Sequence, residues 1–282
     1  MKRSIKKFFG GFSVIHWIAL AFILILLLVS LLIEQISSLD PIAQDLGNRF
    51  APVGDEGHPL GTDQHGRDIL ARIIFGARVE LFIAVTATVL SLVIGTIIGL
   101  VGGYFRGFIG GLAMRSMDVL MVIPPLILAL FVVTLYGPGS VTVTAALTLL
   151  FIPAFARIAY GQTLSVREKE FVEADVLYGA KSLRIIAGTV FPNITPPIIV
   201  QFVLIIASAI LLESGLSFLG LGVVPPTPSW GSMIAEATRF MATNPSVLMV
   251  PSITVVITIL AFSLVGDGLR RSLDPRNGGR NA

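Results

Sequence analysis

Long apolar runs follow one another along the chain, and most charged residues lie between them. An α-helix needs about 20 apolar residues to cross the hydrocarbon core of a bilayer. Six runs come close to or exceed this length, and we expect a membrane-spanning helix in each. They lie at residues 12–33, 81–104, 119–136, 141–160, 194–221 and 248–265. The pattern therefore predicts an all-α membrane protein with six transmembrane helices.

The basic residues predict an orientation for these helices. Lys and Arg concentrate in the cytoplasmic loops of membrane proteins. Most of the 20 basic residues fall on one side of the predicted spans, at residues 1–7, 106–115, 157–184 and 270–280. We therefore expect both termini in the cytoplasm and two external segments, near residues 35–80 and 222–247. The chain then divides into an N-terminal segment (1–80), with the first helix and an external loop, a transmembrane core (81–274) and a cytoplasmic tail (275–282).

Composition removes several classes of function. With 54% hydrophobic and 13% charged residues, the chain is not an ordinary soluble domain, and its expected surroundings are membrane lipid. It has no cysteine, and its three histidines do not cluster. Neither H-E-x-x-H nor G-x-S-x-G occurs, so we expect no catalytic residues and no metal site. The basic groups form no stripe with interleaved aromatic residues, which argues against nucleic-acid binding.

The chain also lacks a phosphate-binding loop of the G-x-x-x-x-G-K-[ST] type. The nearest string, Gly179-Ala180-Lys181-Ser182, has neither the adjacent Gly-Lys nor the spacing. ATP, if it is used, must therefore be bound by another chain.

Features inside the predicted spans favour helix packing and bending. Gly95, Gly99 and Gly103 recur every four residues, which lets another helix approach closely. Pro124-Pro125 and Pro153 remove backbone donors, so each predicts a kink or local unwinding that would suit a gate.

Glu213 lies inside the fifth predicted span, beside Ser214 and Ser217. A carboxylate at such depth is costly unless it faces a wet cavity or a partner. These three residues are candidates for a transport path or a subunit interface. The alternative is a side chain that reaches the membrane surface or is hydrogen-bonded locally.

Residues 161–192 form the longest cytoplasmic connection, between predicted helices 4 and 5. Ser165 and Glu168 are spaced as in a capping box before a short helix. Gly179 is suited to ending that helix, and Ser182 to capping a second one that stops at Gly188. The pattern predicts a helix-turn-helix knob, which either docks on a partner or lies on the membrane surface.

Glu173-Ala174-Asp175 in this connection is followed by Gly179 and Pro192. These residues match the spacing of a motif, and the connection resembles the EAA loop of ABC-importer permeases. Asp175 stands where the motif has its second alanine, Thr189 where isoleucine is usual and Phe191 where leucine is usual.

Two further stretches resemble the C-type subunit of the oligopeptide and dipeptide permeases. One is His58-Pro59-Leu60-Gly61-Thr62-Asp63 with Gly66-Arg67-Asp68 and Gly76-Ala77-Arg78. The other is ESGLSFLGLG at residues 213–222, followed by Pro225-Pro226 and Pro228-Ser229-Trp230-Gly231. Together with the loop they extend over most of the chain.

The resemblance implies a translocation subunit in a bacterial or archaeal cytoplasmic membrane. Its partners would be a second homologous permease, two ATP-binding subunits that hold ATP and Mg, and an external solute-binding protein. Glu173 and Ala174 would enter a groove of an ATP-binding subunit, with Gly179 permitting the turn and Pro192 fixing re-entry into the fifth span. The cargo would be di- or oligopeptides or related small solutes.

The external loops leave two interpretations open. Asp63, Arg67 and Asp68 could contact the solute-binding protein, or could order the outer face through turns and a solvent-exposed ion pair. Trp230 is amphipathic, as are residues that anchor a protein at the membrane–water interface, and it could also contact the solute-binding protein.

An ion-coupled secondary transporter is the alternative function. Such a transporter uses intramembrane carboxylates or broken helices to bind coupling ions. Glu213 is the only strong candidate, and no inverted repeat is visible in the sequence.

Overall fold

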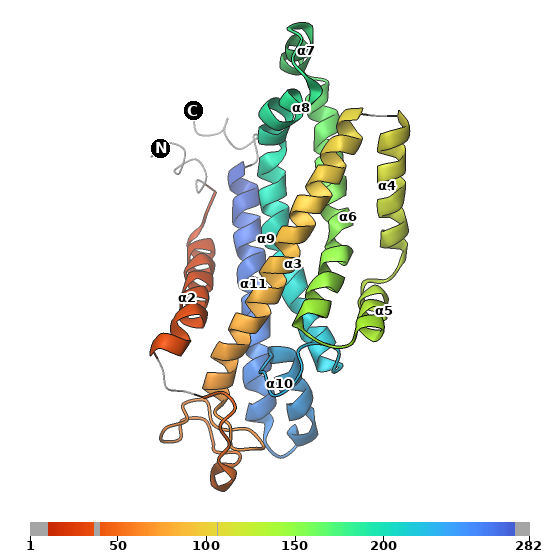
Figure 1. Ribbon diagram of the computed structural model, residues 1–282. Coiled ribbons are helices and arrows are strands. Elements are labelled where there is room, and N and C mark those ends of the chain that lie inside the picture. Colours follow the sequence, from red (N-terminus) through yellow and green to blue (C-terminus); the bar gives the residue numbers. More distant parts are fainter. Residues whose placement is uncertain (1–10, 37–39, 106, 274–282) are drawn as a thin grey trace.

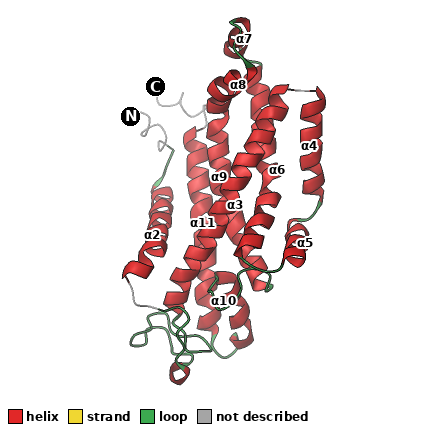
Figure 2. Ribbon diagram, in the orientation of Figure 1, coloured by secondary structure: helices red, strands yellow, loops and turns green. Residues whose placement is uncertain are grey.

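The computed structural model describes residues 11–36, 40–105 and 107–273. Helices and loops make up this part of the chain, and no strand occurs among the described residues (Figure 2). The longer helices are α2 (Val14–Ile36), α3 (Ile69–Phe105), α4 (Gly107–Val122), α5 (Pro125–Tyr136), α6 (Ser140–Arg167), α9 (Phe191–Phe218) and α11 (Pro245–Leu273). The shorter ones are η1 (Leu46–Asn48), α7 (Glu170–Leu177), α8 (Ser182–Ile185), the π-helical turn η2 (Ile186–Val190), α10 (Trp230–Ala237) and η3 (Thr238–Phe240).

By length and composition, five helical stretches of the described chain are candidate membrane spans: α2, α3, α6, α11 and a continuous stretch of α8, η2 and α9. A sixth is the pair α4 and α5, whose axes meet at 88°. The all-helical membrane fold expected from the sequence is therefore confirmed, with a sixth span if the bent pair α4 and α5 is counted as one.

Prolines account for that break. Pro124 lies between α4 and α5, and Pro125 is the first residue of α5. Neither can donate the backbone hydrogen bond that would continue α4. The interruption predicted at this dipeptide is confirmed. At Pro153, by contrast, α6 continues without local unwinding.

Several helices are longer than the hydropathy pattern indicated. Helix α3 begins at Ile69 rather than near residue 81, so the predicted N-terminal segment and core meet inside a helix. The fifth span begins at Ser182 rather than Ile194, and α11 extends to Leu273. The predicted tail at residues 275–282 lies outside the described residues.

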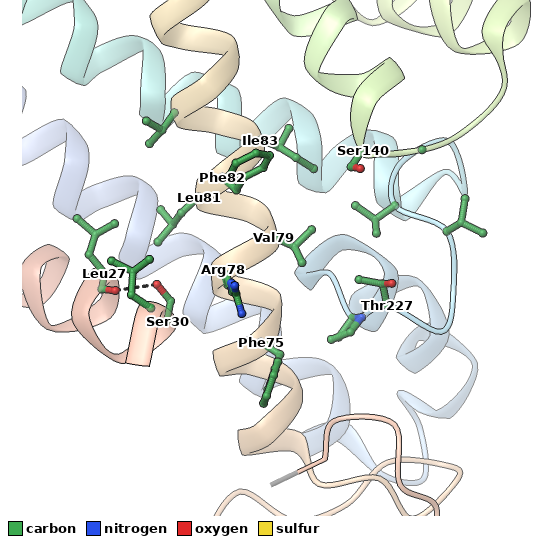
Figure 3. Close-up of a pocket in the computed structure, with 16 residues that line it drawn as sticks. Leu27, Ser30, Phe75, Arg78, Val79, Leu81, Phe82, Ile83, Ser140 and Thr227 are labelled. Atoms are coloured by element: carbon green, nitrogen blue, oxygen red, sulfur yellow. Dashed lines mark hydrogen bonds between the residues drawn. The ribbon is translucent and has the colours of Figure 1, made fainter. Parts of the chain in front are cut away.

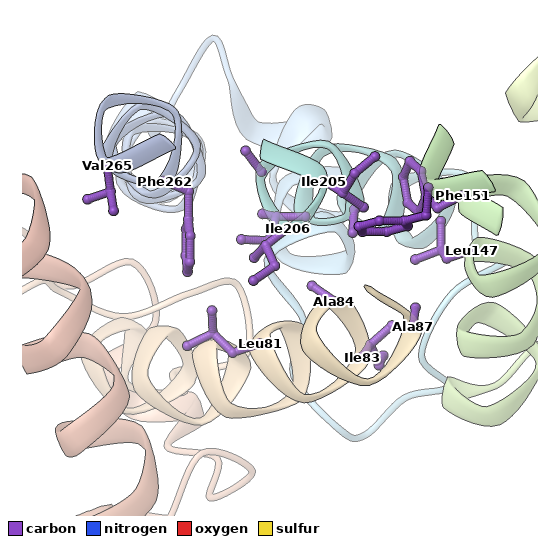
Figure 4. Packing of buried hydrophobic residues seen from close by; sticks show 14 of the residues in the cluster. Leu81, Ile83, Ala84, Ala87, Leu147, Phe151, Ile205, Ile206, Phe262 and Val265 are labelled. Atoms are coloured by element: carbon purple, nitrogen blue, oxygen red, sulfur yellow. The ribbon is translucent and has the colours of Figure 1, made fainter. Parts of the chain in front are cut away.

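Helices α3, α6, α9 and α11 form the centre of the bundle, with α2 on one side and α4 and α5 on the other (Figure 1). Their buried side chains interlock along α3. Leu81 and Ala84 of α3, Phe151 of α6, Ile206 of α9 and Phe262 of α11 belong to one apolar core (Figure 4).

The glycine series on α3 lies against α6. A Cβ atom at Gly95 would come within 2.5 Å of the Ile152 carbonyl oxygen, and one at Gly99 within 2.4 Å of the Ala156 carbonyl oxygen. At Gly103 the nearest atom, Thr163 Cβ, would be 2.8 Å away. The packing role predicted for these glycines is confirmed.

The two ends of the bundle differ. Helices α7 and α8 project at one end, while the 40–68 loop and α10 cover the other (Figure 1). Gly11 donates a hydrogen bond to Ser272 Oγ at 2.9 Å, so the first and last described segments meet, on the side where α11 ends. The two ends of the bundle hold the two groups of candidate site residues.

Candidate functional site

The connection between α6 and α9 is a helical projection. Helix α7 is followed by a tight turn at Gly179, whose φ of +77° lies in the left-handed region that glycine adopts at little cost. The chain then enters α8, passes through the π-helical turn η2 and continues into α9. The predicted helix-turn-helix shape is present, and Gly179 has its predicted role in ending the first helix.

The details of this connection differ from the prediction. Helix α6 runs to Arg167, so Ser165 is inside it, and α7 begins after Lys169 without a side-chain cap. The predicted capping box is therefore wrong. Ser182 is the first residue of α8 rather than its cap, and the helix does not stop at Gly188 because η2 carries it into α9. Pro192 is accordingly the second residue of α9.

The tip of the projection exposes apolar side chains. Leu177, Tyr178 and Leu183 are 87%, 90% and 78% exposed. Glu173 is exposed beside them, and Ala174 is half-buried. An exposed apolar cluster on a short, ordered projection is typical of a surface that docks on another molecule.

The base of the projection is fixed to the bundle. Val172 and Ile185 are almost fully buried. The Arg167 guanidinium donates a hydrogen bond to the Tyr104 carbonyl oxygen and lies 5.4 Å from the centre of the Tyr104 ring. A force applied at the tip would therefore reach the ends of α3 and α6.

The opposite end is closed by a buried ionic network. Arg67 Nε donates to Asp63 Oδ2 at 2.6 Å, and Arg67 Nη2 donates to Glu236 Oε2 of α10 at 2.5 Å. Arg72 of α3 lies 3.7 Å from Asp63 and 3.5 Å from Glu236. Asp63 and Arg67 are only 5% and 7% exposed, so the predicted solvent-exposed pair is wrong. The network ties the 40–68 loop to α3 and α10.

Asp68 has a structural role at the start of α3. Its Oδ1 accepts a hydrogen bond from the Ala71 N–H at 2.7 Å, as an N-cap residue does. Its other oxygen lies 2.7 Å from His58 Nδ1. Both interactions fix where the helix begins.

Asp63, His65 and Glu236 also bring three potential metal-ligating atoms within 4.8 Å of one another. Arg67 bonds both carboxylates of this group, and Arg72 lies near both. The two guanidinium groups already balance the negative charge that would attract a cation, so the group is part of the ionic network.

Glu213 belongs to a second buried junction. Its carboxyl group lies close to that of Glu80 of α3, and both side chains are fully buried. Ser214 Oγ donates to Glu80 Oε1, and Ser217 Oγ donates to Glu213 Oε1 at 2.6 Å. The three candidate residues thus join α9 to α3 within the chain, which excludes the interpretation that Glu213 reaches the membrane surface.

Trp230 closes this junction from α10. It is fully buried, and its indole N–H donates to the Ile73 carbonyl oxygen at 3.0 Å. Gly76 gives it room, because a Cβ there would lie 3.1 Å from the indole ring. The prediction of an interface anchor at Trp230 is wrong.

Beside the junction, an open apolar groove of about 810 Å³ runs between α2, α3 and the segment before α10 (Figure 3). Its walls include Leu27, Phe75, Phe82 and Val223, with Arg78 as its charged member. Neither Glu80 nor Glu213 lines it. The groove is thus separate from the buried carboxyl pair.

Comparison with known proteins assigns the family. The model of the binding-protein-dependent transport system inner membrane component matches residues 91–279. This chain belongs to that family. The permease is 38% identical over 264 residues to the dipeptide transport system permease protein of Escherichia coli strain K12, covering 92% of this chain and 88% of that protein. It is 37% identical over 262 residues to a di/tripeptide transport system permease protein of Pseudomonas aeruginosa, covering 91% and 86%.

A glutathione transport system permease protein of Escherichia coli strain UTI89 is 41% identical over 219 residues, covering 78% of this chain and 72% of the other. Among solved structures, the inward-facing MetNI methionine ABC transporter matches with a TM-score of 0.60 at 17% identity, covering 72% of the permease and 96% of that chain. The latter likeness supports the fold of an ABC-transporter permease.

Three residues of the two junctions at the end opposite α7 were absent from the sequence-based candidates: Arg72, Glu80 and Glu236. Arg72 and Glu80 stand just before the apolar run at residue 81, which places them in a loop by hydropathy. Arg72 and Glu80 are eight residues apart, a spacing that puts both on nearly the same face of a helix. That spacing was the available signal that the helix begins before residue 81.

Proposed function

We propose that this permease forms part of the path by which peptides or related small solutes enter the cell, powered by ATP hydrolysis in separate subunits. The observation that carries the proposal is its similarity, over about nine-tenths of its length, to permeases named for dipeptide and di/tripeptide transport. The glutathione permease, also similar, is named for another small peptide.

The projection of α7 and α8 is the proposed coupling element. Its exposed apolar tip and the neighbouring Glu173 and Ala174 would dock on an ATP-binding subunit. Asp175 and Gly179 would set the shape of the projection, and Pro192 would begin the span that receives its motion. The buried base supports this assignment, because a firmly anchored projection transmits movement to the bundle.

ATP and Mg would be bound by the partner subunits, since the sequence has no phosphate-binding loop of its own. The chain would then act as a translocation subunit without enzymatic activity. A second homologous permease would complete the path, and an external solute-binding protein would deliver the cargo.

The outer end would receive that binding protein. Asp63, Arg67, Asp68 and Trp230 are buried in the permease, so we assign them to ordering this face rather than to touching the partner. Both termini and the α7 projection would lie on the cytoplasmic side of a bacterial or archaeal inner membrane.

The secondary-transporter alternative has less support. Its principal candidate, Glu213, takes part in packing between α3 and α9, with Ser217 and Glu80 as its partners. No observation favours an ion path at this site.

The test is purification of the tagged permease from its native membrane, followed by mass spectrometry and reconstitution. We expect a second permease and ATP-binding subunits to co-purify, and the complex with its binding protein to accumulate a radiolabelled dipeptide in proteoliposomes only when ATP is supplied. Recovery of the chain alone, while a control ABC complex stays intact, would contradict the proposal. ATP-driven uptake that excludes all peptides would overturn the cargo assignment alone.

A further inference from the structure

One hydrogen bond joins the α7 projection to the start of the long fifth span. Thr189 Oγ1, in the π-helical turn η2, donates to Asp175 Oδ2 of α7 at 2.6 Å. The two residues are 14 positions apart and both are half-buried. The bond therefore closes the projection into a loop, across the turn at Gly179.

Asp175 is poorly suited to its place for helix stability alone. It lies in the last turn of α7, where the helix dipole disfavours a negative charge. Aspartate is also a weak helix former. Its carboxylate accepts a charge-assisted hydrogen bond from Thr189, which offsets part of this cost.

Thr189 is unusual among the helical threonines. Threonine in a helix commonly donates to the carbonyl oxygen four residues earlier, as Thr195 does to Phe191 at 2.8 Å and Thr88 does to Ala84 at 2.6 Å. Thr189 instead donates to a side chain of another helix. The wider turn of η2 alters the helical register at this point, and π-helical turns of this kind occur frequently at functional sites.

Each of the two side chains depends on the other for this bond. A polar residue at either position alone would leave a half-buried group without this partner, so the two side chains form a hydrogen-bonded pair.

We propose that the Asp175–Thr189 bond is a clasp that holds α7 at a fixed angle to α9, and that both are positioning residues for energy coupling. This inference rests on the proposed function, because it assumes that α7 receives the motion of an ATP-binding subunit. With the clasp closed, displacement of α7 pulls on η2 and so on α9. With it absent, α7 pivots about Gly179 and part of the displacement is lost.

The experiment measures dipeptide transported per ATP hydrolysed by the reconstituted complex with its binding protein. Thr189→Val removes the hydroxyl and keeps the shape, and Asp175→Ala removes the acceptor. We expect each to lower the ratio roughly two- to tenfold, the range that loss of one net hydrogen bond gives. The double variant should fall no further than the worse single variant, because all three lack the same bond.

Two variants serve as controls. Thr195→Val makes the same change six residues further along, at a hydroxyl bonded within its own helix, and is expected to leave the ratio unchanged. Thr189→Ser keeps the donor and should restore most of the coupling.

A purely structural role would lower the yield or thermal stability of the complex while the ratio stayed constant, and that result would overturn the clasp. Additive losses in the double variant would also overturn it. A wild-type complex that assembles with ATP-binding subunits but shows no ATP-driven uptake would instead contradict the proposed function itself.

Discussion

Gly179 is the residue whose backbone forms the turn of the proposed coupling element, the projection of α7 and α8. Its φ of +77° is strained for any residue with a Cβ, while no atom lies within 4 Å of where that Cβ would stand. A substitution here therefore meets no neighbour, and its cost of about 1–2 kcal/mol comes from the backbone alone.

Gly179→Val is expected to change coupling rather than folding. The strained turn would relax and tilt α7, so that ATP hydrolysis continues while peptide uptake per ATP falls. Gly161→Val is the control, because Gly161 also has open space around its Cβ position but lies inside α6. Equal ratios in the Gly179 variant and the wild type, measured in proteoliposomes, would refute this role.

The carboxyl pair of Glu80 and Glu213 gives a prediction about stability. Two buried carboxyl groups side by side cannot both carry a charge at low cost, and each side chain accepts a hydrogen bond from a serine hydroxyl. Glu213→Gln keeps the acceptor for Ser217, removes a charge and adds a donor toward Glu80, so we expect unchanged or higher thermal stability in detergent. Glu213→Ala removes the acceptor and is expected to lose about 1–3 kcal/mol. If Gln proved as damaging as Ala, the junction would need the charge itself.

Helix α10 packs closely against α9 because Gly231 has no side chain. A Cβ at Gly231 would lie 2.1 Å from the Ser214 carbonyl oxygen and 2.8 Å from Ser217 Cβ. Neither neighbour has room to move, because Ser214 and Ser217 hold the buried carboxyl pair. The close approach also brings Trp230 onto α3.

Gly231→Ala is therefore expected to lower the midpoint of thermal unfolding in detergent, at a cost of about 1–3 kcal/mol for overpacking. Gly215→Ala is the matched control on α9, since nothing lies within 4 Å of its Cβ position. That control is expected to be neutral or slightly stabilising, because alanine is the better helix former. Equal melting midpoints for the two variants would show that α10 is free to shift.

The elements that the sequence predicted well are those determined by local pattern. Apolar length located the spans, and Pro124-Pro125 located the break between α4 and α5. The start of α3 was missed because Arg72 and Glu80 interrupt the apolar pattern. Both are buried through partners more than 100 residues away, Glu236 and Glu213, and a hydropathy window does not detect such pairing.

Across the whole molecule, the two candidate sites differ in the same way: one is formed by residues close in sequence, the other by residues far apart in sequence. The projection of α7 and α8 is built from one short stretch, residues 170–185, so its helices and its turn at Gly179 could be anticipated from spacing. The opposite end of the bundle assembles the 40–68 loop, α3, α9 and α10, and its burial of Trp230 and Arg67 follows from tertiary contacts. Trp230 and Arg67, which we expected at the surface from the sequence, are buried and hold neighbouring elements together.

The orientation of the two ends can be tested directly because the chain contains no cysteine, so single cysteines can be introduced without removing others. Leu46, in the 40–68 loop, is 65% exposed, and Tyr178, at the coupling tip, is 90% exposed. We expect a membrane-impermeant maleimide to label Leu46→Cys in spheroplasts. Tyr178→Cys should be labelled only after the membrane is opened and the ATP-binding subunits are stripped from it.

A control cysteine at Ala87, which is fully buried in α3, should resist labelling in both states. Labelling of Tyr178→Cys in sealed spheroplasts would place the α7 projection outside, away from any cytoplasmic ATPase. The coupling role of Glu173, Gly179 and the Asp175–Thr189 bond would then be untenable, because each requires α7 to meet its partner on the side where ATP is hydrolysed.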